Sequence, residues 1–478
     1  MRRAVTLIAL LATACTTMEP KYARPAPAIP ASWPVGDPYL AQAEVGLPVL
    51  TYQQVFQDPR LQSLIAQALA NNRDLMVAAS NIASAREQYR IQRAQQLPTL
   101  NAAASATVSG DSRDYNLGLQ VPSFELDLFG RVRSLTHVQL EQYLATEAGA
   151  RATRLTLVAS VAGAWLDYAA DSSLRLIAEQ TAASAQKSVN LTRIRLQGGV
   201  APRTDLSQAE QILAVAQADL AQQRTAVAQD VNALQLLVGA PIDPKLLARS
   251  IDEAFGKIAP VPAGLDSYVL LRRPDVVQAE YRLRAANAQI GAARAALFPR
   301  ITLTGLLGFA SSALGSLFTG GALGWSVGGN AAYTIFQSGA GHAGVRQSEA
   351  ERNAAVATYQ KTIQTAFREV ADALARRGTI NDEIGARERQ QAATADTYNL
   401  TEARYRAGID PFLTVLDAQR SYYSAQQQMV QTKLTAAQNI VTLYQSIGGD
   451  TLMQATPVCQ PLPGDHAAGV TPARDCTP

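Results

Sequence analysis

The chain has 478 residues, of which 47% are hydrophobic and 17% are charged, and its formal net charge is +3. This length allows several domains, and the near balance of charge argues against a nucleic-acid-binding protein, which needs a concentrated basic patch. Only 6% of the residues are aromatic, and small residues are frequent in the long proline-free stretches, a composition that suits helices and close helix packing.

The chain begins with an export signal. Arg2 and Arg3 are basic, residues 4–11 form an apolar run, and small residues precede Cys15. The apolar run is far shorter than the ~18 residues that a membrane-spanning helix needs. The pattern matches a bacterial lipobox and predicts a signal peptide over 1–14 and lipidation of Cys15, the alternative being an ordinary signal peptide cut near a chance cysteine. Thr16 follows Cys15 in place of the aspartate that tends to retain lipoproteins in the inner membrane, so the outer membrane is favoured.

The region after the signal is predicted to be a lipid anchor followed by an extended tether. Residues 15–59 are rich in proline and have few periodic segments, which is typical of extended linkers. At the other end, residues 448–478 are predicted to form an irregular tail. This tail contains Cys459 and Cys476. Export places both in an oxidising compartment, where they could form a disulfide bond.

A first helix is predicted from about Asp58 to Gln96. Its apolar residues fall on one face at helical spacing, and Pro98 follows its end. We therefore expect an amphipathic helix that precedes the first strand.

Alternating residues then predict two strands at about 99–109 and 115–126, joined by a polar turn at 110–114. The same alternation recurs at about 300–310 and 325–336, with a connecting region about eight residues longer. About ten residues is the length at which a tilted strand crosses a bilayer. Both hairpins are therefore predicted to lie in a membrane, the alternative being soluble edge pairs.

The chain contains two copies of one unit. Three positions recur 209 residues later in the same order: Gly130, Gly199 and Pro202 match Gly339, Gly408 and Pro411. Because no residue is gained or lost between them, the segment is predicted to be a rigid helix of about 69 residues, roughly 100 Å long. Apolar residues recur at steps of 3 and 4 on both sides of each turn, which predicts antiparallel helix pairs at about 130–238 and 339–447.

These patterns define the predicted domains. A first repeat covers residues 60–240 and a second covers 265–447, each in the order helix, hairpin, long helix, helix. Residues 241–264 contain four prolines and are predicted to be a linker that packs around the outside of the rods.

Two short motifs fit enzyme fingerprints but lie in the wrong context. Residues 339–344 fit G-x-G-x-x-G, yet the predicted helix continues far beyond the short crossover of a dinucleotide site. Residues 324–328 fit G-x-S-x-G around Ser326, but they lie inside an alternating strand, not at a strand-to-helix turn. The three histidines are scattered and do not cluster with cysteine. We therefore predict no enzyme activity, no metal and no cofactor.

Four strands per chain are too few to close a barrel, and open sheet edges are not stable in lipid. Two chains would give an eight-stranded barrel filled by side chains, whereas three would give twelve strands and a lumen. The fold class is therefore predicted to be mainly α-helical with a membrane β-barrel, in a homotrimer whose twelve-stranded β-barrel continues into a twelve-helix α-barrel. A constriction is predicted at the far ends of the rods, at residues 199–205 and 408–417.

The chain resembles the lipoprotein branch of the TolC-like outer membrane factors, the OprM/NodT type, over nearly the whole mature sequence. Phe124 stands where a tryptophan is usual, and Lys21 where the anchor motif usually has an acidic or amide residue. The resemblance rests on these blocks: Phe124–Arg133, Arg272–Val276, Ala285–Gly291, Phe298–Thr304, Tyr405–Asp410 and Leu416–Ser421.

The resemblance implies a trimeric exit duct in the outer membrane of a Gram-negative bacterium. It also implies two protein partners, a periplasmic adaptor and a proton-driven inner-membrane pump of the resistance-nodulation-division type. The implied cargo is drugs, detergents or other amphiphiles, and the implied resting state is closed.

Carried over by position, Leu413 and Asp417 would line the narrowest ring, and Tyr405 would contact Asp205 to hold the ring shut. Arg420 lies one helical turn from Asp417 and could pair with it, the alternative being solvated charges at a helix start. Three converging carboxylates repel one another, so the aperture should favour cations. The predicted gate residues are Leu413, Asp417, Tyr405, Asp205, Asp410 and Arg420.

Three other functions remain open at this point. A secretion duct for proteins or oligosaccharides would share the same fold and differ in its partner pump. A structural lipoprotein with coiled-coil rods would need no lipid-crossing strands and would show no conductance. An exported hydrolase using Ser326 would react with a serine-directed probe.

Overall fold

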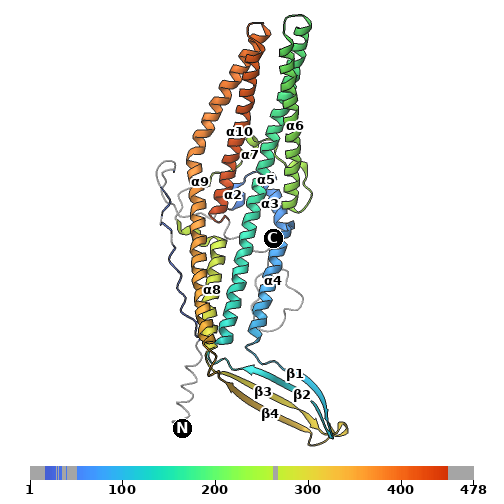
Figure 1. Ribbon diagram of the computed structural model, residues 1–478, viewed down its shortest axis with the longest axis vertical. Helices are drawn as coiled ribbons and strands as arrows, with labels where there is room; N and C mark the ends of the chain where they lie inside the picture. Colours follow the sequence, from blue (N-terminus) through green and yellow to red (C-terminus); the bar gives the residue numbers. More distant parts are fainter. Residues whose placement is uncertain are drawn as a thin grey trace. The chain divides into compact units, whose positions relative to one another are not determined.

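The computed structural model of the protein describes residues 17–27, 29–30, 32–34, 39, 51–261 and 267–449. Two compact units are formed, each from several stretches of the chain (Figure 1). The predicted lipidation site and the predicted disulfide lie outside the described residues, since Cys15, Cys459 and Cys476 are not among them. Unit 1 comprises residues 1–28, 79–149 and 275–362, and unit 2 comprises 29–78, 150–274 and 363–478.

Unit 1 contains one antiparallel sheet of four strands in the order β1-β2-β3-β4. The two hairpins join because β2 pairs with β3, with Leu119 opposite Leu307. Most strand residues are exposed in the single chain, including all of β4. The strands are β1 (Asn101–Ser109), β2 (Ser112–Glu125), β3 (Arg300–Ser311) and β4 (Leu323–Ala332).

Two details of the sheet differ from the sequence prediction. The first turn is tighter than the predicted 110–114, because β1 and β2 pair up to Ser109 and Ser112 and leave two residues between them. Gly110 adopts φ 61°, which glycine tolerates at low cost. The last strand ends at Ala332, not near residue 336, because Ala332 pairs with Arg300, the first residue of β3.

The helices of unit 1 lie next to the sheet in sequence. The first parts of two long helices belong to this unit, and both helices continue into unit 2. The helices that contribute to unit 1 are α4 (Arg73–Ala94), α5 (Arg131–Gln197), α8 (Pro274–Ala295) and α9 (Ala340–Arg406).

Part of the predicted tether is fixed against unit 1. His137 on α5 lies between two carboxylates, with Nδ1 2.8 Å from Glu19 and Nε2 3.1 Å from Glu141. These two hydrogen bonds, first that with Glu141 and then that with Glu19, raise the pKa of His137 to about 10. The imidazole is therefore charged at neutral pH; it pairs with Glu141 on its own helix and holds the segment around Glu19 by one ion pair.

A second anchor for the same segment is Glu280 on α8, a buried residue. Its carboxylate accepts hydrogen bonds from Tyr22 (3.3 Å), from Arg24, and from Arg284 (2.6 Å). Close packing adds to these bonds, since a Cβ on Gly130 would lie only 2.9 Å from the Cα of Thr17. Residues 17–24 are thus an ordered strap, whereas the sequence predicted only an extended tether.

Unit 2 contains the second parts of α5 and α9 and the two helices that follow them. Short helices occupy the predicted linker, so this region is partly regular. The other helices of unit 2 are α2 (Tyr52–Val55), α3 (Pro59–Asn71), α6 (Arg203–Val238), η1 (Pro244–Leu246), α7 (Ile251–Phe255), η2 (Ser267–Arg272) and α10 (Phe412–Ser446).

The helix predicted from Asp58 to Gln96 is broken in two at Asn72. Asn72 is extended, with φ −62° and ψ 132°. Its side-chain oxygen accepts hydrogen bonds from the N–H groups of Asp74 (2.9 Å) and Leu75 (3.2 Å), so it caps α4. Its amide also donates to the carbonyl of Leu237 at 2.9 Å. The prediction of one continuous helix was wrong because the cap interrupts the helix without disturbing the apolar period.

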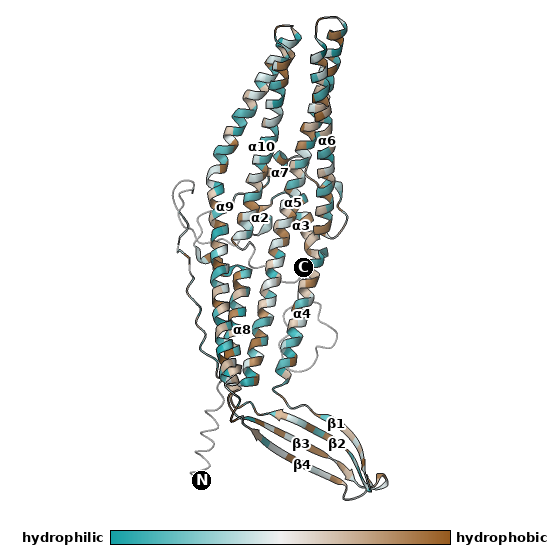
Figure 2. Ribbon diagram, in the orientation of Figure 1, coloured by the Kyte–Doolittle hydropathy of each residue, from teal (hydrophilic) through white to brown (hydrophobic). Residues whose placement is uncertain are grey.

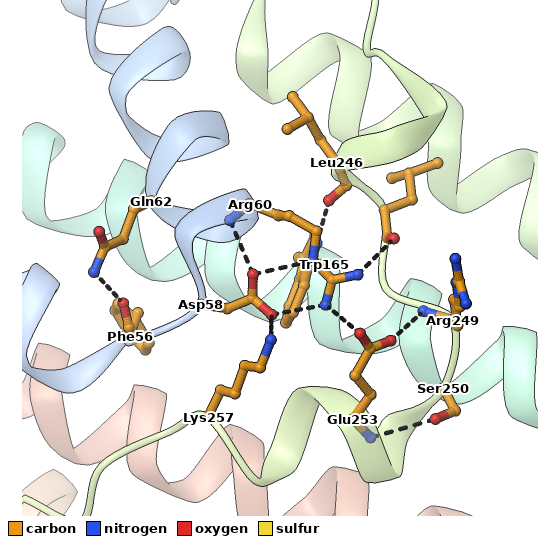
Figure 3. A network of polar contacts seen from close by, with 11 residues as sticks. Phe56, Asp58, Arg60, Gln62, Trp165, Leu246, Arg249, Ser250, Glu253 and Lys257 are labelled. Carbon is orange, nitrogen blue, oxygen red and sulfur yellow. Dashed lines mark hydrogen bonds and ion pairs between the residues drawn. The ribbon is translucent and has the colours of Figure 1, made fainter.

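A charged network holds the start of α3 to the linker helix α7 (Figure 3). Asp58, only 1% exposed, accepts from Arg60 at 2.7 Å and lies 3.4 Å from Lys257. Burial raises the pKa of Asp58, but the bonds from Arg60 outweigh that effect and lower it. Arg60 also contacts Glu253 at 3.0 Å and lies over the ring of Trp165. Every charge in this network is compensated.

Figure 2 shows polar and apolar residues mixed along the long helices. Among the helices of the described residues, none is both long enough and apolar enough to cross a membrane.

The two repeats share their turn glycines. Each of three glycines in the first repeat has a positive φ and a counterpart 209 positions later that also has one. These residues start and end the long helices, where only glycine adopts the left-handed conformation at low cost. The pairs are Gly130 (73°) with Gly339 (80°), Gly199 (72°) with Gly408 (77°), and Gly239 (72°) with Gly448 (95°).

Candidate functional site

The candidate site is the end of unit 2 where each long helix turns back, at Gly199 and Gly408. Both turns have the same hydrogen-bond pattern. The N–H of Val200 donates to the carbonyl of Arg195 at 2.9 Å, and the N–H of Ile409 donates to the carbonyl of Arg404 at 3.0 Å. Each is the long bond of a Schellman motif, which satisfies carbonyls at a helix end and reverses the chain sharply.

An apolar cluster joins all four helices behind these turns. It contains residues of α5 and α6 as well as residues of α9 and α10, and the ring of Tyr405 lies 5.2 Å from that of Phe412. The two helix pairs are therefore held together near their ends by apolar burial. We call this set the tip cluster: Val189, Ala209, Tyr405, Phe412, Val415 and Leu416.

Arg195 links the first helix pair to the second at the edge of the tip cluster. Its Nη1 donates to the backbone carbonyl of Tyr405 at 2.8 Å. Its guanidinium carbon lies 4.6 Å from the centroid of the Tyr405 ring, a cation–π contact. A hydrogen bond from a charged donor is stronger than a neutral one. Arg195 therefore fixes the end of α5 against the end of α9.

A second link lies further along the same helices. The hydroxyls of Ser184 on α5 and Tyr398 on α9 are 2.9 Å apart. The ring of Tyr398 stacks on Tyr422 of α10 with centroids 6.0 Å apart. Sequence reasoning did not identify Arg195, Ser184 or Tyr398. Nothing in the apolar period distinguishes them from other polar residues of the rods.

The predicted contact between Tyr405 and Asp205 is not made by the Tyr405 hydroxyl. Tyr405 is only 6% exposed, and its hydroxyl is buried without a hydrogen-bond partner among the described residues. Asp205 lies in the first turn of α6 and is partly exposed. The link from Tyr405 to the first helix pair runs through Arg195 in this structure, and the contact with Asp205 stays a prediction.

Asp410 is tied to its own turn. Arg404 donates to the two carboxylate oxygens of Asp410 at 2.7 and 2.9 Å, a bidentate pair. The hydrogen bond from Arg404 lowers the pKa of Asp410, and the same bond raises the pKa of Arg404. Asp410 therefore stabilises the Gly408 turn, and its carboxylate is already paired.

The remaining predicted gate residues form an exposed stripe on α10. Leu413, Asp417 and Arg420 are spaced by four and three residues, so they share one face. All three are exposed in the single chain, Leu413 by 55%. The predicted pair between Asp417 and Arg420 is not formed among the described ion pairs. Among the described residues, no hydrogen bond or ion pair engages Asp417 or Arg420, so the stripe presents an apolar, an acidic and a basic group at the surface of the single chain.

The features that suggested enzymes have other places in the fold. Ser326 lies in the interior of β4, and α9 runs without interruption for 67 residues after Gly339. Among the described residues, no group of three or more histidine, cysteine, aspartate or glutamate side chains is arranged to hold a metal ion.

Comparison with known proteins identifies the family. The sequence profile of the family described as outer membrane efflux protein matches residues 64–240 and 266–449. The chain belongs to this family. Both repeats lie within the match, and the gate positions predicted on α6, α9 and α10 fall inside it.

Relatives and solved structures agree with the family assignment. The chain is 43% identical over 444 residues to the probable efflux pump outer membrane protein TtgC of Pseudomonas putida, covering 90% of this chain and 92% of that protein. It is 40% identical over 458 residues to the outer membrane protein OprJ of Pseudomonas aeruginosa, covering 93% and 94%. The open-state MtrE outer membrane channel of Neisseria gonorrhoeae superposes with a TM-score of 0.83 at 35% identity, covering 91% and 99%.

As an outer membrane efflux protein, the chain is the exit duct of a tripartite efflux system and acts with an adaptor and an inner-membrane pump. It is a transporter component and not an enzyme. The prediction of an efflux duct in the outer membrane is confirmed.

Proposed function

We propose that three copies of this chain form the duct, with one barrel wall and one helical tunnel shared among them. The sheet supports this most directly. Strands β1 and β4 are edge strands, each paired on one side only, and the exposed strand residues leave the sheet without a core of its own. Unpaired edges are not stable in lipid. Pairing β4 of one copy with β1 of the next removes every edge and gives twelve strands around a lumen.

The tip cluster region is the proposed gate. In a three-fold arrangement, the exposed stripe of Leu413, Asp417 and Arg420 faces the axis from each copy, and the three Asp417 carboxylates repel one another. Arg195 and the tip cluster resist that repulsion by holding the two helix pairs of each copy together. Opening requires the pairs to separate or rotate, so the strength of the Arg195 contact sets the resting conductance.

The proposed cargo is drugs, solvents or other amphiphiles, delivered by a proton-driven inner-membrane pump of the resistance-nodulation-division type through a periplasmic adaptor. This cargo is supported by the names of the relatives, which include a toluene efflux pump protein and a solvent efflux pump protein of Pseudomonas putida. We further propose that Cys15 is lipidated and that outer membrane lipid is a partner at the protein's N-terminus.

Conductance of the purified protein in planar lipid bilayers tests the gate. We expect low resting conductance with a preference for cations, and a higher single-channel conductance for Asp417→Ala because the ring loses its charges. Glu388→Ala is the matched control, since Glu388 is an exposed acid of α9 away from the turns. Unchanged conductance in Asp417→Ala would remove this residue from the gate, and absence of any conductance in the wild type would contradict the duct.

A further inference from the structure

The connection between β3 and β4 is a folded loop with hydrogen bonds of its own. It contains the short helix η3 (Leu314–Ser316), and the hydroxyls of Ser311 and Ser316 lie 2.6 Å apart. The hydroxyl of Thr319 donates to the carbonyl of Ser316 at 2.7 Å. We call residues 312–322 the cap loop. Its shape is fixed by these bonds, so its side chains have defined positions.

The cap loop lies at the end of the sheet that is away from the helices. Helices α4 and α8 lead into β1 and β3, whereas β2 and β4 lead into α5 and α9. Since neighbouring strands are antiparallel, all four connections to helices are at one end of the sheet. The cap loop and the turn at residues 110–111 are at the other end. In the proposed duct the helices extend toward the inner-membrane pump, so this end lies at the outer surface of the membrane.

The two hairpins differ in charge at this end. The first hairpin carries Asp111, Arg113 and Asp114 there. The cap loop has no charged residue, and it has two large apolar side chains that are exposed in the single chain, Leu314 by 63% and Phe318 by 71%. The ends of the two hairpins are therefore suited to different surroundings, the first to water and the second to an apolar phase.

The two faces of the sheet also differ in polarity. Directly opposite residues share a face, and Leu307 lies opposite both Leu119 and Trp325. Trp325 and Val327, on this apolar face, are 78% and 72% exposed. The other face carries Asn116, Gln120, Thr302, Ser326 and Asn330, together with the apolar Leu306. In a membrane barrel the apolar face is the one that contacts lipid.

The cap loop bends onto the apolar face. Phe309 lies on this face, because it is opposite Leu117 and two residues from Leu307 on the same strand. The ring of Phe318 packs edge-on against the ring of Phe309, with the centroids 5.6 Å apart. Phe318 therefore extends the apolar face past the end of the strands, and it does not cover the polar face. A contiguous exposed apolar surface of this kind marks a contact with a partner or a membrane.

We propose that the cap loop is a membrane contact, in which Leu314 and Phe318 insert among the lipid acyl chains at the outer surface of the bilayer. The inference rests on the proposed barrel, whose apolar face is in lipid. Aromatic side chains are common where the acyl chains of a membrane meet the headgroups. Each copy then has one hairpin end anchored in lipid, at the cap loop, and one hairpin end in water, at Asp111.

Fluorescent labelling of the full-length protein in phosphatidylcholine vesicles tests the contact. The environment-sensitive NBD group is attached at Leu314→Cys or Phe318→Cys, in a background in which Cys459 and Cys476 are replaced by serine, and the signal of that background alone is subtracted. We expect a blue-shifted emission that nitroxide-labelled lipid quenches and iodide does not. Asp111→Cys, at the end of the first hairpin, is the matched control, and iodide should quench its label.

Two outcomes would overturn the proposal. Quenching of the cap-loop labels by iodide would mean that the loop lies in water, and protection from both quenchers would mean that protein covers it. Val327→Cys separates this inference from the barrel, because Val327 is on the apolar face in the interior of β4. If lipid quenches the label at this position but not the cap-loop labels, only the anchor is refuted. If iodide quenches it, the barrel proposal fails as well.

A second variant tests the contact without an attached label. Phe318→Trp is a conservative change at an exposed position, and brominated lipids quench tryptophan only at short range. We expect this variant to gain tryptophan fluorescence that brominated lipid quenches, relative to the wild type with its three tryptophans. Asp111→Trp is the control and should gain fluorescence that this lipid does not quench. Equal quenching of the added tryptophan in the two variants would contradict the anchor.

Discussion

Arg195 and Arg404 stand at the same point of the two repeats, 209 positions apart, yet they bond in different directions. Arg404 bonds to Asp410 within its own turn, whereas Arg195 reaches the carbonyl of Tyr405 in the other helix pair. The counterpart of Asp410 in the first repeat is Ala201. Alanine offers no carboxylate, so the guanidinium of Arg195 is free to link the two pairs. One residue difference between the repeats thus creates the link.

Removing the Arg195 side chain is expected to loosen the tip. Arg195→Ala loses a hydrogen bond from a charged donor, about 1.5–3 kcal/mol in typical cases, and the cation–π contact with Tyr405. Single-channel conductance should therefore rise. Arg404→Ala is the matched control. It also replaces an arginine by alanine, but it breaks only a solvent-exposed pair inside one turn. Equal effects of the two substitutions would show that Arg195 has no special role.

Placing an acid at position 201 tests the same relationship without removing Arg195. Ala201→Asp copies the second repeat and should attract Arg195 into its own turn, which releases the carbonyl of Tyr405. We expect conductance to increase toward the level of Arg195→Ala. In Arg195→Ala, the added Ala201→Asp change should have little further effect, because the competing group is gone. Independent, additive effects would contradict the competition.

Two glycines with the same backbone angle separate conformational strain from steric clash. Gly199 and Gly239 both have φ 72°. A Cβ on Gly199 meets no atom within 4 Å, whereas a Cβ on Gly239 would lie 2.7 Å from the carbonyl oxygen of Asn71. Gly199→Ala should lower the free energy of unfolding by about 1–2 kcal/mol, and Gly239→Ala by at least about 1 kcal/mol more. Denaturant unfolding in detergent measures both, and equal losses would mean that the backbone at Asn71 yields to the new methyl group.

The cap between α3 and α4 should contribute measurable stability. Asn72→Ala removes both side-chain bonds to the first turn of α4 and the bond to Leu237. Loss of the cap alone typically costs about 1 kcal/mol, and the carbonyl of Leu237 also loses its partner. Asn81→Ala, at an exposed position inside α4, serves as the comparison and should change stability little. A loss no larger than that of Asn81→Ala would show that water replaces the cap.

The strap at residues 17–24 should show an alkaline pH dependence. The pKa of His137 is raised to about 10 in the folded protein, against 6.5 ordinarily. Its contribution is therefore complete below about 6.5 and is lost as pH rises through about 10. Protease resistance of the strap should persist at about pH 8 and fall toward pH 10. His137→Gln should remove this transition and His342→Gln, at an exposed position, should retain it. Loss of resistance already near pH 7 would contradict the pKa.

Much of the architecture was readable from residue spacing. The 209-residue offset predicted two copies, and glycines with positive φ stand at the offset positions. Alternation predicted strands where the structure has them to within a few residues. The predictions failed where the outcome depends on a partner distant in sequence. Asn72 fits a helix by period, yet its side chain finds the N–H groups of α4 and the carbonyl of Leu237.

The candidate site was likewise predicted only in part from the sequence. Its place at the two turns followed from the Gly-Pro signals, and Leu413, Asp417 and Arg420 are exposed together on α10. The partner of Tyr405 did not follow. The resemblance pointed to Asp205, whereas Arg195 makes the contact here. The local sequence shows that Arg195 lacks the acid that pairs with Arg404 in its own turn, but it does not identify the acceptor at Tyr405 in the other helix pair.

The sequence by itself determined the repeat, the positions of the turns and the alternation of the strands, because each depends on residues that are close along the chain. Only the tertiary structure decided which groups meet: Arg195 with Tyr405, Asn72 with Leu237, and His137 with Glu19. The physical reason is the distance along the chain over which each effect acts. Backbone conformation responds to the nearest few residues, whereas the charge state and bonding of a side chain depend on neighbours that folding brings from far away.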